Sequence, residues 1–200
     1  MAKIRLTKNE LKRQKDDLKR FNRYLPTLIL KKQQLQIEIR KVVHSRARLQ
    51  DRREEVTRDL ERWIAVFGEE LGLEELLEVE SLHLERGNIA GVDIPIFEGL
   101  DFRPVTYDLF RMPPWVDAGV AVLEELLTME AELRVLEEQI HLLGEELRVT
   151  TQRVNLFEKV KIPEAKENIR MIQIYLGDQQ TAAVVRGKIA KNKIVGASGR

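Results

Sequence analysis

Residues 126–157, LLTMEAELRVLEEQIHLLGEELRVTTQRVNLF, decide the fold of this chain. Their apolar side chains recur at intervals of seven in two interleaved series. The series are Leu126, Leu133, Ile140, Leu147 and Val154, and Met129, Leu136, Leu143 and Phe157. A repeat near 3.5 residues places apolar side chains on one narrow seam of a helix, and one partner helix covers such a seam. The stretch therefore predicts a coiled coil.

A matching ladder in the first half of the chain supplies the partner helix. It consists of Phe21, Leu28, Leu35, Val42, Leu49, Val56 and Trp63. A second series, Leu11, Leu18, Leu25, Ile39, Leu60 and Phe67, is broken by Lys32, Arg46 and Arg53. The spacing of Thr7 and Glu10 is that of a capping box. We expect this helix to begin near Thr7, to kink at Pro26 and to end near Gly68 or Leu77; alternatively, it begins after Pro26.

The heptads stop in the middle of the chain, which predicts a β-hairpin. Residues 79–85 alternate in part, and residues 92–97 include the β-branched Val92, Ile94 and Ile96, with a glycine-containing turn at 87–91 between the two stretches. Pro95 favours an edge position. We expect a short hairpin with an exposed tip, ended by Pro113 and Pro114.

The second helix is expected from Trp115 to about Ile189, with a stutter or kink near Pro163. The predicted fold class is mainly α: a long antiparallel two-helix coiled coil with a short β-hairpin or irregular region at the turn end. The predicted parts are residues 1–77 (first long helix), 78–114 (hairpin and connection), 115–191 (second long helix) and 192–200 (flexible basic tail). In this topology Lys12 lies near Gln173 and Leu35 near Val149.

Charge is divided unevenly along a chain whose net charge is only +1. Residues 1–50 hold 15 Lys and Arg against 4 Asp and Glu; residues 51–147 hold 8 against 25; residues 148–200 hold 11 against 4. If the two ladders fold back on each other, both basic segments lie at one end and the acidic segment at the other.

Composition excludes several classes of protein. There are 0 cysteines, so disulfides and thiolate metal sites are excluded. The charged fraction of 34% and aromatic fraction of 6% suit long exposed helices better than a thick core. No signal peptide and no transmembrane run is expected, so the predicted location is cytoplasmic.

Residues with catalytic or ligand chemistry do not form a recognisable motif. His44, His83 and His141 are far apart in sequence, and Ser45, Ser81 and Ser198 lack a triad context. Gly187-Lys188 lacks the rest of a phosphate-binding loop. Five adjacent glutamate pairs are expected to be solvated helix faces, since neighbouring helical residues point in different directions: Glu69-Glu70, Glu74-Glu75, Glu124-Glu125, Glu137-Glu138 and Glu145-Glu146. We therefore expect no catalytic, cofactor or metal site and no enzymatic activity.

The basic residues near the N-terminus have two interpretations. They are Lys12, Arg13, Lys15, Lys19, Arg20 and Arg23. Such a set binds phosphates of nucleic acid or of an anionic membrane. The cationic faces carry few aromatic residues and no nucleic-acid module is recognisable. A solvated face, or one that meets an acidic protein, is favoured.

Four segments resemble those of one family. They are residues 7–11, TKNEL; 28–35, LILKKQQL; 88–95, NIAGVDIP; and 153–158, RVNLFE, followed by Ile162-Pro163. Together they resemble the D subunit, the central rotor stalk of V-type (A/V-type) ATP synthases, over essentially the whole chain. Departures at Tyr24, Ile29 and Gln33 make it similar to a divergent bacterial member.

The resemblance implies a non-catalytic shaft that couples ATP synthesis or hydrolysis to proton or sodium transport by rotation. Its implied partners are the catalytic and non-catalytic subunits of the ATPase ring, a small central-stalk subunit, and the subunit that couples to the membrane rotor ring. It implies a peripheral location without direct membrane insertion, no nucleic-acid partner and no cofactor. A basic tip that includes Lys12, Lys15, Lys19, Arg20, Lys166 and Arg170 is expected to face the ring. The alternatives are a self-assembling coiled-coil scaffold or tether, and a basic helical protein on nucleic acid or membrane.

Overall fold

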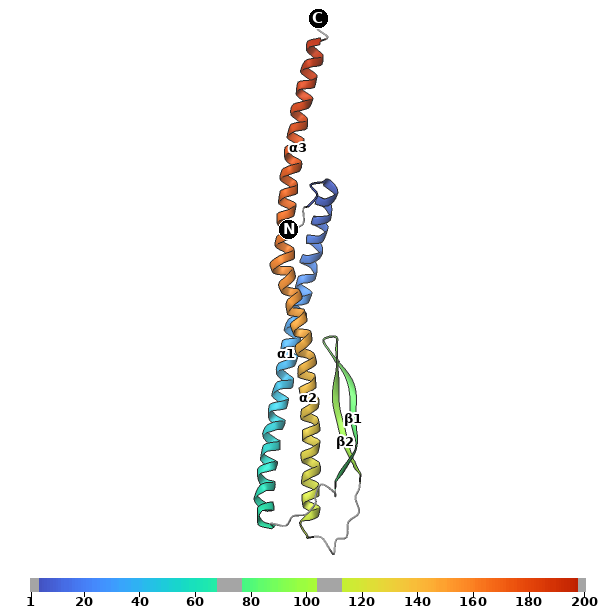
Figure 1. Ribbon diagram of the computed structural model, residues 1–200, viewed down its shortest axis with the longest axis vertical. Helices are drawn as coiled ribbons and strands as arrows, with labels where there is room; N and C mark the ends of the chain where they lie inside the picture. The colour runs from blue at the N-terminus through green and yellow to red at the C-terminus, as the bar shows by residue number, and fades with distance from the viewer. Residues whose placement is uncertain (1–3, 68–76, 104–112, 198–200) are drawn as a thin grey trace. The chain divides into compact units, whose positions relative to one another are not determined.

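The computed structural model describes residues 4–67, 77–103 and 113–197 (Figure 1). Its elements follow the order α1 (Lys8–Phe67), β1 (Glu78–Ile89), β2 (Val92–Arg103), α2 (Val116–Leu156), η2 (Phe157–Lys161) and α3 (Ile162–Ala197). The predicted mainly α fold class is confirmed. Residues 1–30 with 150–200 form one unit, and residues 31–149 form a second. Each unit is described by itself below.

Helix α1 begins where its capping residue predicts. The Glu10 N–H donates to Thr7 Oγ1 at 3.2 Å, which satisfies one of the free donors of the first turn. The reciprocal half of the capping box is replaced by other bonds. The Thr7 N–H donates to the Arg5 carbonyl at 3.0 Å, and the Glu10 carboxylate accepts from Gln14 Nε2 at 2.8 Å. The helix continues through Pro26 as one element, so the alternative start after Pro26 is wrong; the kink there stays a prediction.

In the unit of residues 31–149, the two helices run antiparallel. Ion pairs join Lys31 to Glu146, Arg46 to Glu137 and Arg53 to Glu130, so partner numbers fall along α2 as they rise along α1. The predicted fold-back within one chain is therefore confirmed for this unit. The same arrangement brings Leu35 into a cluster with Leu143 and Leu147, close to the predicted Val149.

Three segments form the apolar core of this unit. Leu35 and Val42 of α1, Leu143 of α2 and Ile94 of β2 are buried together. Leu35 and Leu143 are each 0% exposed. The hairpin is therefore packed on the helical pair, and its Ile94 is part of the same core as the heptad residues.

The hairpin is longer than predicted because β1 continues through Gly87 and Asn88, which the sequence suggested as turn residues. Only Ala90 and Gly91 form the loop, with φ angles of 53° and 78°. Positive φ at both positions is the signature of a type I′ turn, whose twist matches that of the strands. Gly91 adopts this conformation at no steric cost, whereas Ala90 is in a region that L-residues avoid.

The expected exposed tip is wrong for the apolar side of the hairpin. Ile89, Ala90 and Val92 pack against the cluster of Leu35 and Leu143. The hairpin lies alongside α2 (Figure 1). Asn88 and Gly91 suggested an exposed tip, but the apolar side chains of Ile89, Ala90 and Val92 beside them are packed against the core.

Two β-bulges keep one face of the hairpin apolar. The register shifts between Val79 and Ser81 on β1, and between the pairs His83–Gly99 and Leu84–Phe97. A bulge inserts one residue and reverses which face the following side chains occupy. Leu82 and Leu84 are thereby on the same side of the hairpin as Leu100 and Pro95, and these residues line one groove.

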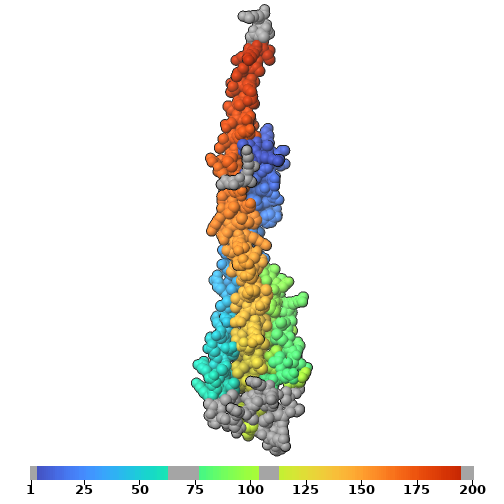
Figure 2. All heavy atoms as spheres, viewed as in Figure 1, coloured from blue at the N-terminus to red at the C-terminus, as the bar shows by residue number. Residues whose placement is uncertain are grey.

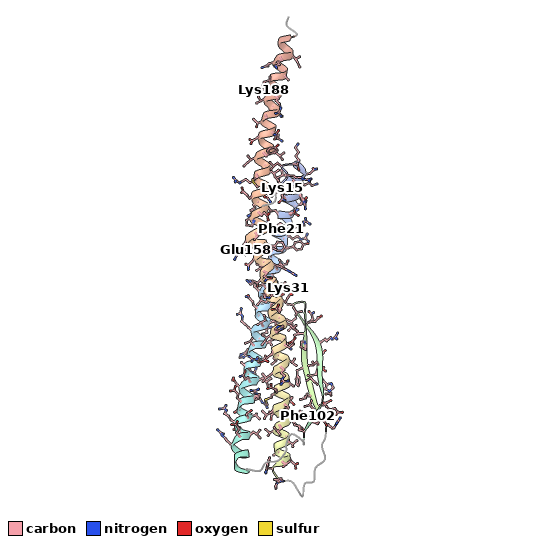
Figure 3. All side chains as sticks on the ribbon, in the orientation of Figure 1. Lys15, Phe21, Lys31, Phe102, Glu158 and Lys188 are labelled. Carbon is pink, nitrogen blue, oxygen red and sulfur yellow. The ribbon has the colours of Figure 1, made fainter. Side chains whose placement is uncertain are left out.

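In the unit of residues 1–30 and 150–200, α1 packs against η2 and α3. The ring of Phe21, which Figure 3 labels, lies 5.3 Å from that of Phe157 between centroids. Asn168 Nδ2 donates to Gln14 Oε1 at 3.4 Å, near the predicted pairing of Lys12 with Gln173. Asn168 is 7% exposed, so this pair is a polar contact within the helical seam.

A π-helical segment accounts for the shift in phase expected near Pro163, whereas the kink there stays a prediction. The Ile162 N–H donates to the Phe157 carbonyl, five residues back, across η2. Buried residues follow the heptad up to Val154 and then resume at Ile162, Ala165 and Ile172, one residue later than a seven-residue step from Val154 predicts. The local irregularity was predicted correctly, but it is an inserted residue rather than an interruption of the helix.

Helix α3 extends to Ala197, beyond the end predicted at residue 191. Residues 192–197 of the expected tail are thus helical, whereas residues 198–200 lie outside the described part of the chain. From residue 177 to 194 every side chain of α3 is exposed except the half-buried Ala182. Among the described residues of this unit, the last turns of α3 therefore have no companion helix (Figure 1).

We expect Leu35→Ala to reduce the free energy of unfolding by about 2–5 kcal/mol, because it removes buried methyl groups from the point where helices and hairpin meet. Ile37→Ala is the matched control, since Ile37 is 50% exposed on the same helix. Urea denaturation followed by circular dichroism measures both. Equal midpoints for the two variants would contradict the placement of the core.

Candidate functional site

The hairpin brings together Ser81, His83 and Asp101. The Ser81 hydroxyl and His83 Nε2 are 3.1 Å apart, and His83 Nε2 lies 2.6 Å from Asp101 Oδ2. His44 and His141 are exposed on α1 and α2 and do not join this group, and Ser198 lies outside the described residues. The trio belongs to the β-strand segment between the two bulges.

The geometry of this trio is not that of a nucleophilic triad. In a triad, the serine and the carboxylate contact opposite nitrogens of the imidazole. The carboxylate orients the ring, and the other nitrogen accepts the proton of the serine hydroxyl. Here Ser81 and Asp101 contact the same nitrogen, and the Ser81 hydroxyl also donates to Asp101 at 3.3 Å. The arrangement joins the two strands across the exposed face of the hairpin.

The Asp101 carboxylate is stabilised by these neighbours. The hydrogen bond from His83 is the largest cause that lowers the pKa of Asp101 below its ordinary value of 3.8. Burial is the next-largest cause and opposes this lowering, while the charge of His83 and the bond from Ser81 add to it. A lowered pKa in the folded state means that Asp101 favours folding above its unfolded-state pKa. That contribution is lost as the pH falls through the lower, folded-state pKa.

The glutamate pairs on α2 act mainly in ion pairs. Glu125, Glu137 and Glu146 contact Arg52, Arg46 and Lys31 of α1. Glu145 pairs along α2 with Arg148, which holds the pKa of Glu145 below its ordinary value. Glu69, Glu70, Glu74 and Glu75 lie outside the described residues. Solvent weakens such pairs, so their main effect is on helix direction and register.

The predicted basic surface lies on exposed turns of α1 and α3. Lys12, Arg13, Lys15, Lys19, Arg20 and Arg23 are all exposed on α1, and Figure 3 labels Lys15 among them. Arg20 pairs with Asp17, and Arg170 pairs with Glu167 on α3. No ion pair joins Lys12, Lys15, Lys19 or Lys166 to an acidic group in the described part of the chain.

Gly187 and Lys188 lie inside α3, where the backbone is helical (Figure 3). A phosphate-binding loop needs a loop whose N–H groups surround the phosphate. Over residues 4–67, 77–103 and 113–197, no group of three His, Asp or Glu side chains is arranged to hold a metal ion. In the same residues, no helix is apolar enough over a sufficient length to cross a bilayer.

An apolar groove between the hairpin and α2 was missed by the sequence reasoning. It has a volume of about 400 Å³, and its lining is mostly apolar but includes three charged residues. The apolar residues are Val79, Leu82, Leu84, Leu100, Leu127, Ala131 and Val135, and the charged ones are Glu130, Arg134 and Glu138. Leu82 and Leu84 are 46% and 47% exposed. The spacing of Leu127, Ala131 and Val135 at every fourth residue, beside the heptad seam, is the signal that could have revealed a second apolar face of α2.

The fold and its surfaces define an α-helical coiled-coil protein with a β-hairpin packed against its second helix. The chain belongs to the ATP synthase D subunit family, whose family model matches residues 10–192. This family is that of the central-stalk subunit of rotary V-type ATPases, so the predicted family and central-stalk function are confirmed.

Curated relatives cover nearly the whole chain. The V-type ATP synthase D subunit of Borreliella burgdorferi is 50% identical over 195 residues, which span 98% of this chain and 96% of that protein. The proteins of the same name from Chlamydia pneumoniae and Chlamydia muridarum are 34% and 33% identical, and each match covers 96% of this chain and 94% or 97% of the relative.

We expect the Asp101 carboxyl to titrate below 3.8 and to move back toward that value in His83→Ala, because the variant removes the largest cause of the shift. Carbon-detected NMR of the side-chain carboxyl over a pH range of about 2 to 6, which brackets the ordinary titration of aspartate, measures this directly. Glu98→Gln, a neighbouring change that leaves the Asp101 contacts in place, is the control. An Asp101 titration unchanged by His83→Ala would contradict the assigned contact.

Proposed function

We propose that this chain is the rotating shaft of a V-type ATP synthase and that it carries no catalytic site of its own. It couples ATP synthesis or hydrolysis in the catalytic ring to proton or sodium transport. Its partners are the catalytic and non-catalytic ring subunits, the small central-stalk subunit and the subunit that joins the membrane rotor ring. In this role the chain is cytoplasmic, peripheral to the membrane, and binds neither nucleic acid nor a cofactor.

The unaccompanied end of α3 is the observation that carries this proposal. Gln14, near the start of α1, lies opposite Asn168, so α3 continues for many residues beyond its partner helix. Val184, Val185 and Ile189 are at least half exposed there, and the space-filling view shows this segment uncovered on the face drawn (Figure 2). A helix of this length that keeps apolar side chains exposed is suited to insertion into a surrounding ring of subunits.

The surface around this end suits a moving contact. Lys12, Lys15, Lys19 and Lys166 are exposed on the same unit and form no ion pair with its described residues. Charged, hydrated side chains are attracted to an acidic inner surface of the ring over a distance. They do not form the tightly packed contacts that buried apolar side chains form. A shaft must be held in the ring while it still turns, and such a surface supports both needs.

Copurification tests the proposal. A tagged chain expressed in its native cell should retain the catalytic ring, whereas the double variant Val185→Glu, Ile189→Glu should retain less of it, because charges replace the apolar contact. Gln180→Glu with Asn192→Glu adds the same charge to exposed positions of α3 and is the matched control. Absence of the ring from the unmodified sample would contradict the assignment as a shaft.

Charge reversal tests the basic surface separately. Replacing Lys12, Lys15, Lys19 and Lys166 by Glu should lower the number of ions transported per ATP hydrolysed, since attraction to the ring becomes repulsion. The structure favours these four lysines over Arg20 and Arg170, which already have partners in the chain. Lys41→Glu, in the other unit, is the control. Full coupling in the fourfold variant, measured in vesicles, would show that this surface does not hold the shaft.

A further inference from the structure

The two strands of the hairpin have outer edges of different character. On β2, Pro95 has no N–H to offer, and its carbonyl accepts a hydrogen bond from Gln139 Nε2 of α2 at 2.5 Å. Gln139 is 7% exposed, so the chain itself covers this edge at Pro95. Near the turn of the hairpin, Figure 1 draws β1 farther from α2 than β2. The outer edge of β2 is therefore occupied at Pro95, and the outer edge of β1 is considered next.

The bond to Gln139 fixes the direction of the backbone groups along β1. Residues of an antiparallel pair either bond each other or both point their N–H and C=O groups outward, and the two kinds of pair alternate. The Pro95 carbonyl points outward, so its pair Arg86–Pro95 is of the outward kind. By alternation, Leu84 and Asn88 also point outward. The turn gives the same result. Ile89 and Val92 flank a two-residue turn and therefore bond each other, and alternation from this bonded pair makes Asn88, Arg86 and Leu84 point outward.

These outward groups are accessible. Leu84, Arg86 and Asn88 are all exposed residues, and among the described residues no backbone hydrogen bond outside the ladder involves any of them. An unpaired row of N–H and C=O groups on an edge strand is a template for another strand. The segment from Leu84 to Asn88 offers three outward N–H and three outward C=O groups by this assignment.

The side chains near this edge indicate the chemistry of the occupant. Leu82 and Leu84 are about half exposed on the side of the groove against α2. On the opposite side, Glu85 is exposed, and the exposed Asp101 of β2 is already bonded to His83 and Ser81. Alternate residues of a third strand would point to these two sides in turn. The surface therefore fits an extended segment with apolar residues at alternate positions and a basic residue opposite Glu85.

We propose that the outer edge of β1, from Leu84 to Asn88, binds an extended strand of another subunit of the ATP synthase and extends the hairpin to a three-stranded sheet. Main-chain hydrogen bonds supply the attachment, and the half-exposed leucines select apolar residues. A third strand also stabilises the hairpin, because two strands alone are marginally stable in water. The inference rests on assembly of this chain with other ATPase subunits.

Hydrogen exchange of the backbone amides tests the site without any mutation. In the isolated chain, the amides of Leu84, Arg86 and Asn88 should exchange fast, while those of Glu85 and Gly87, which bond β2, are protected. In the purified ATPase complex, the three outward amides should slow by about tenfold or more. Fast exchange in the complex overturns the proposal, as does protection in the isolated monomer. Dimers of the isolated chain with the same protected edge would identify a second copy as the occupant instead.

A pair of variants separates the backbone edge from the side chain. Arg86→Pro removes one outward N–H and spares the ladder, since it faces Pro95 in a pair that forms no ladder bond. Arg86→Ala removes the same side chain and keeps the N–H. The proline variant should lose protection of Leu84 and Asn88 in the complex, and the alanine variant should keep it. Protected Glu85 and Gly87 amides verify that the hairpin is intact; equal behaviour of both variants overturns the proposal. Retention of the catalytic ring by both variants keeps this test separate from that of the shaft function.

Discussion

Burial of Ile94 between Leu35 and Leu143 is the contact on which the unit of residues 31–149 depends. A narrow heptad seam holds two helices together, but it leaves no place for a hairpin. A hairpin of two strands is in turn marginally stable by itself. The Ile94 contact joins the hairpin to the helices: its β-branched side chain packs with Leu35 and Leu143, while its strand remains beside α2. The type I′ turn matters for the same reason, since it directs Ile89 and Val92 toward this core.

Ion pairs between α1 and α2 favour the direction and register of the helices, whereas the apolar core provides most of the stability. The basic residues of α1 that interrupt its second heptad series, Arg46 and Arg53, contact Glu137 and Glu130 of α2. Each pair is partly exposed and contributes little to stability. A parallel arrangement would separate these two pairs of opposite charges and lose their attraction. The uneven charge of the sequence therefore favours one direction and one register, at little energetic gain from any single pair.

Elements with a regular repeat of apolar residues could be predicted from the sequence. Heptads predicted both long helices, Thr7 predicted the start of α1, and Pro163 marked the neighbourhood of η2. Features without a period were harder to predict. Gly87 and Asn88 have turn propensity, yet cross-strand pairing overrides it and extends β1. The groove depends on a second apolar face of α2 and on two bulges, and a bulge changes the face of a side chain without a distinctive sequence signal.

The π-helical segment has a practical consequence for measurements on the C-terminal helix. It accommodates one additional residue between Val154 and Ile162, so positions seven apart on either side of it do not share a face. One residue corresponds to a rotation of about 100° around an α-helix. Fluorescent dyes attached at such positions would report different orientations although they follow the same repeat. Alignments of this region likewise need a gap or insertion at residues 157–161 wherever a relative continues as a regular α-helix.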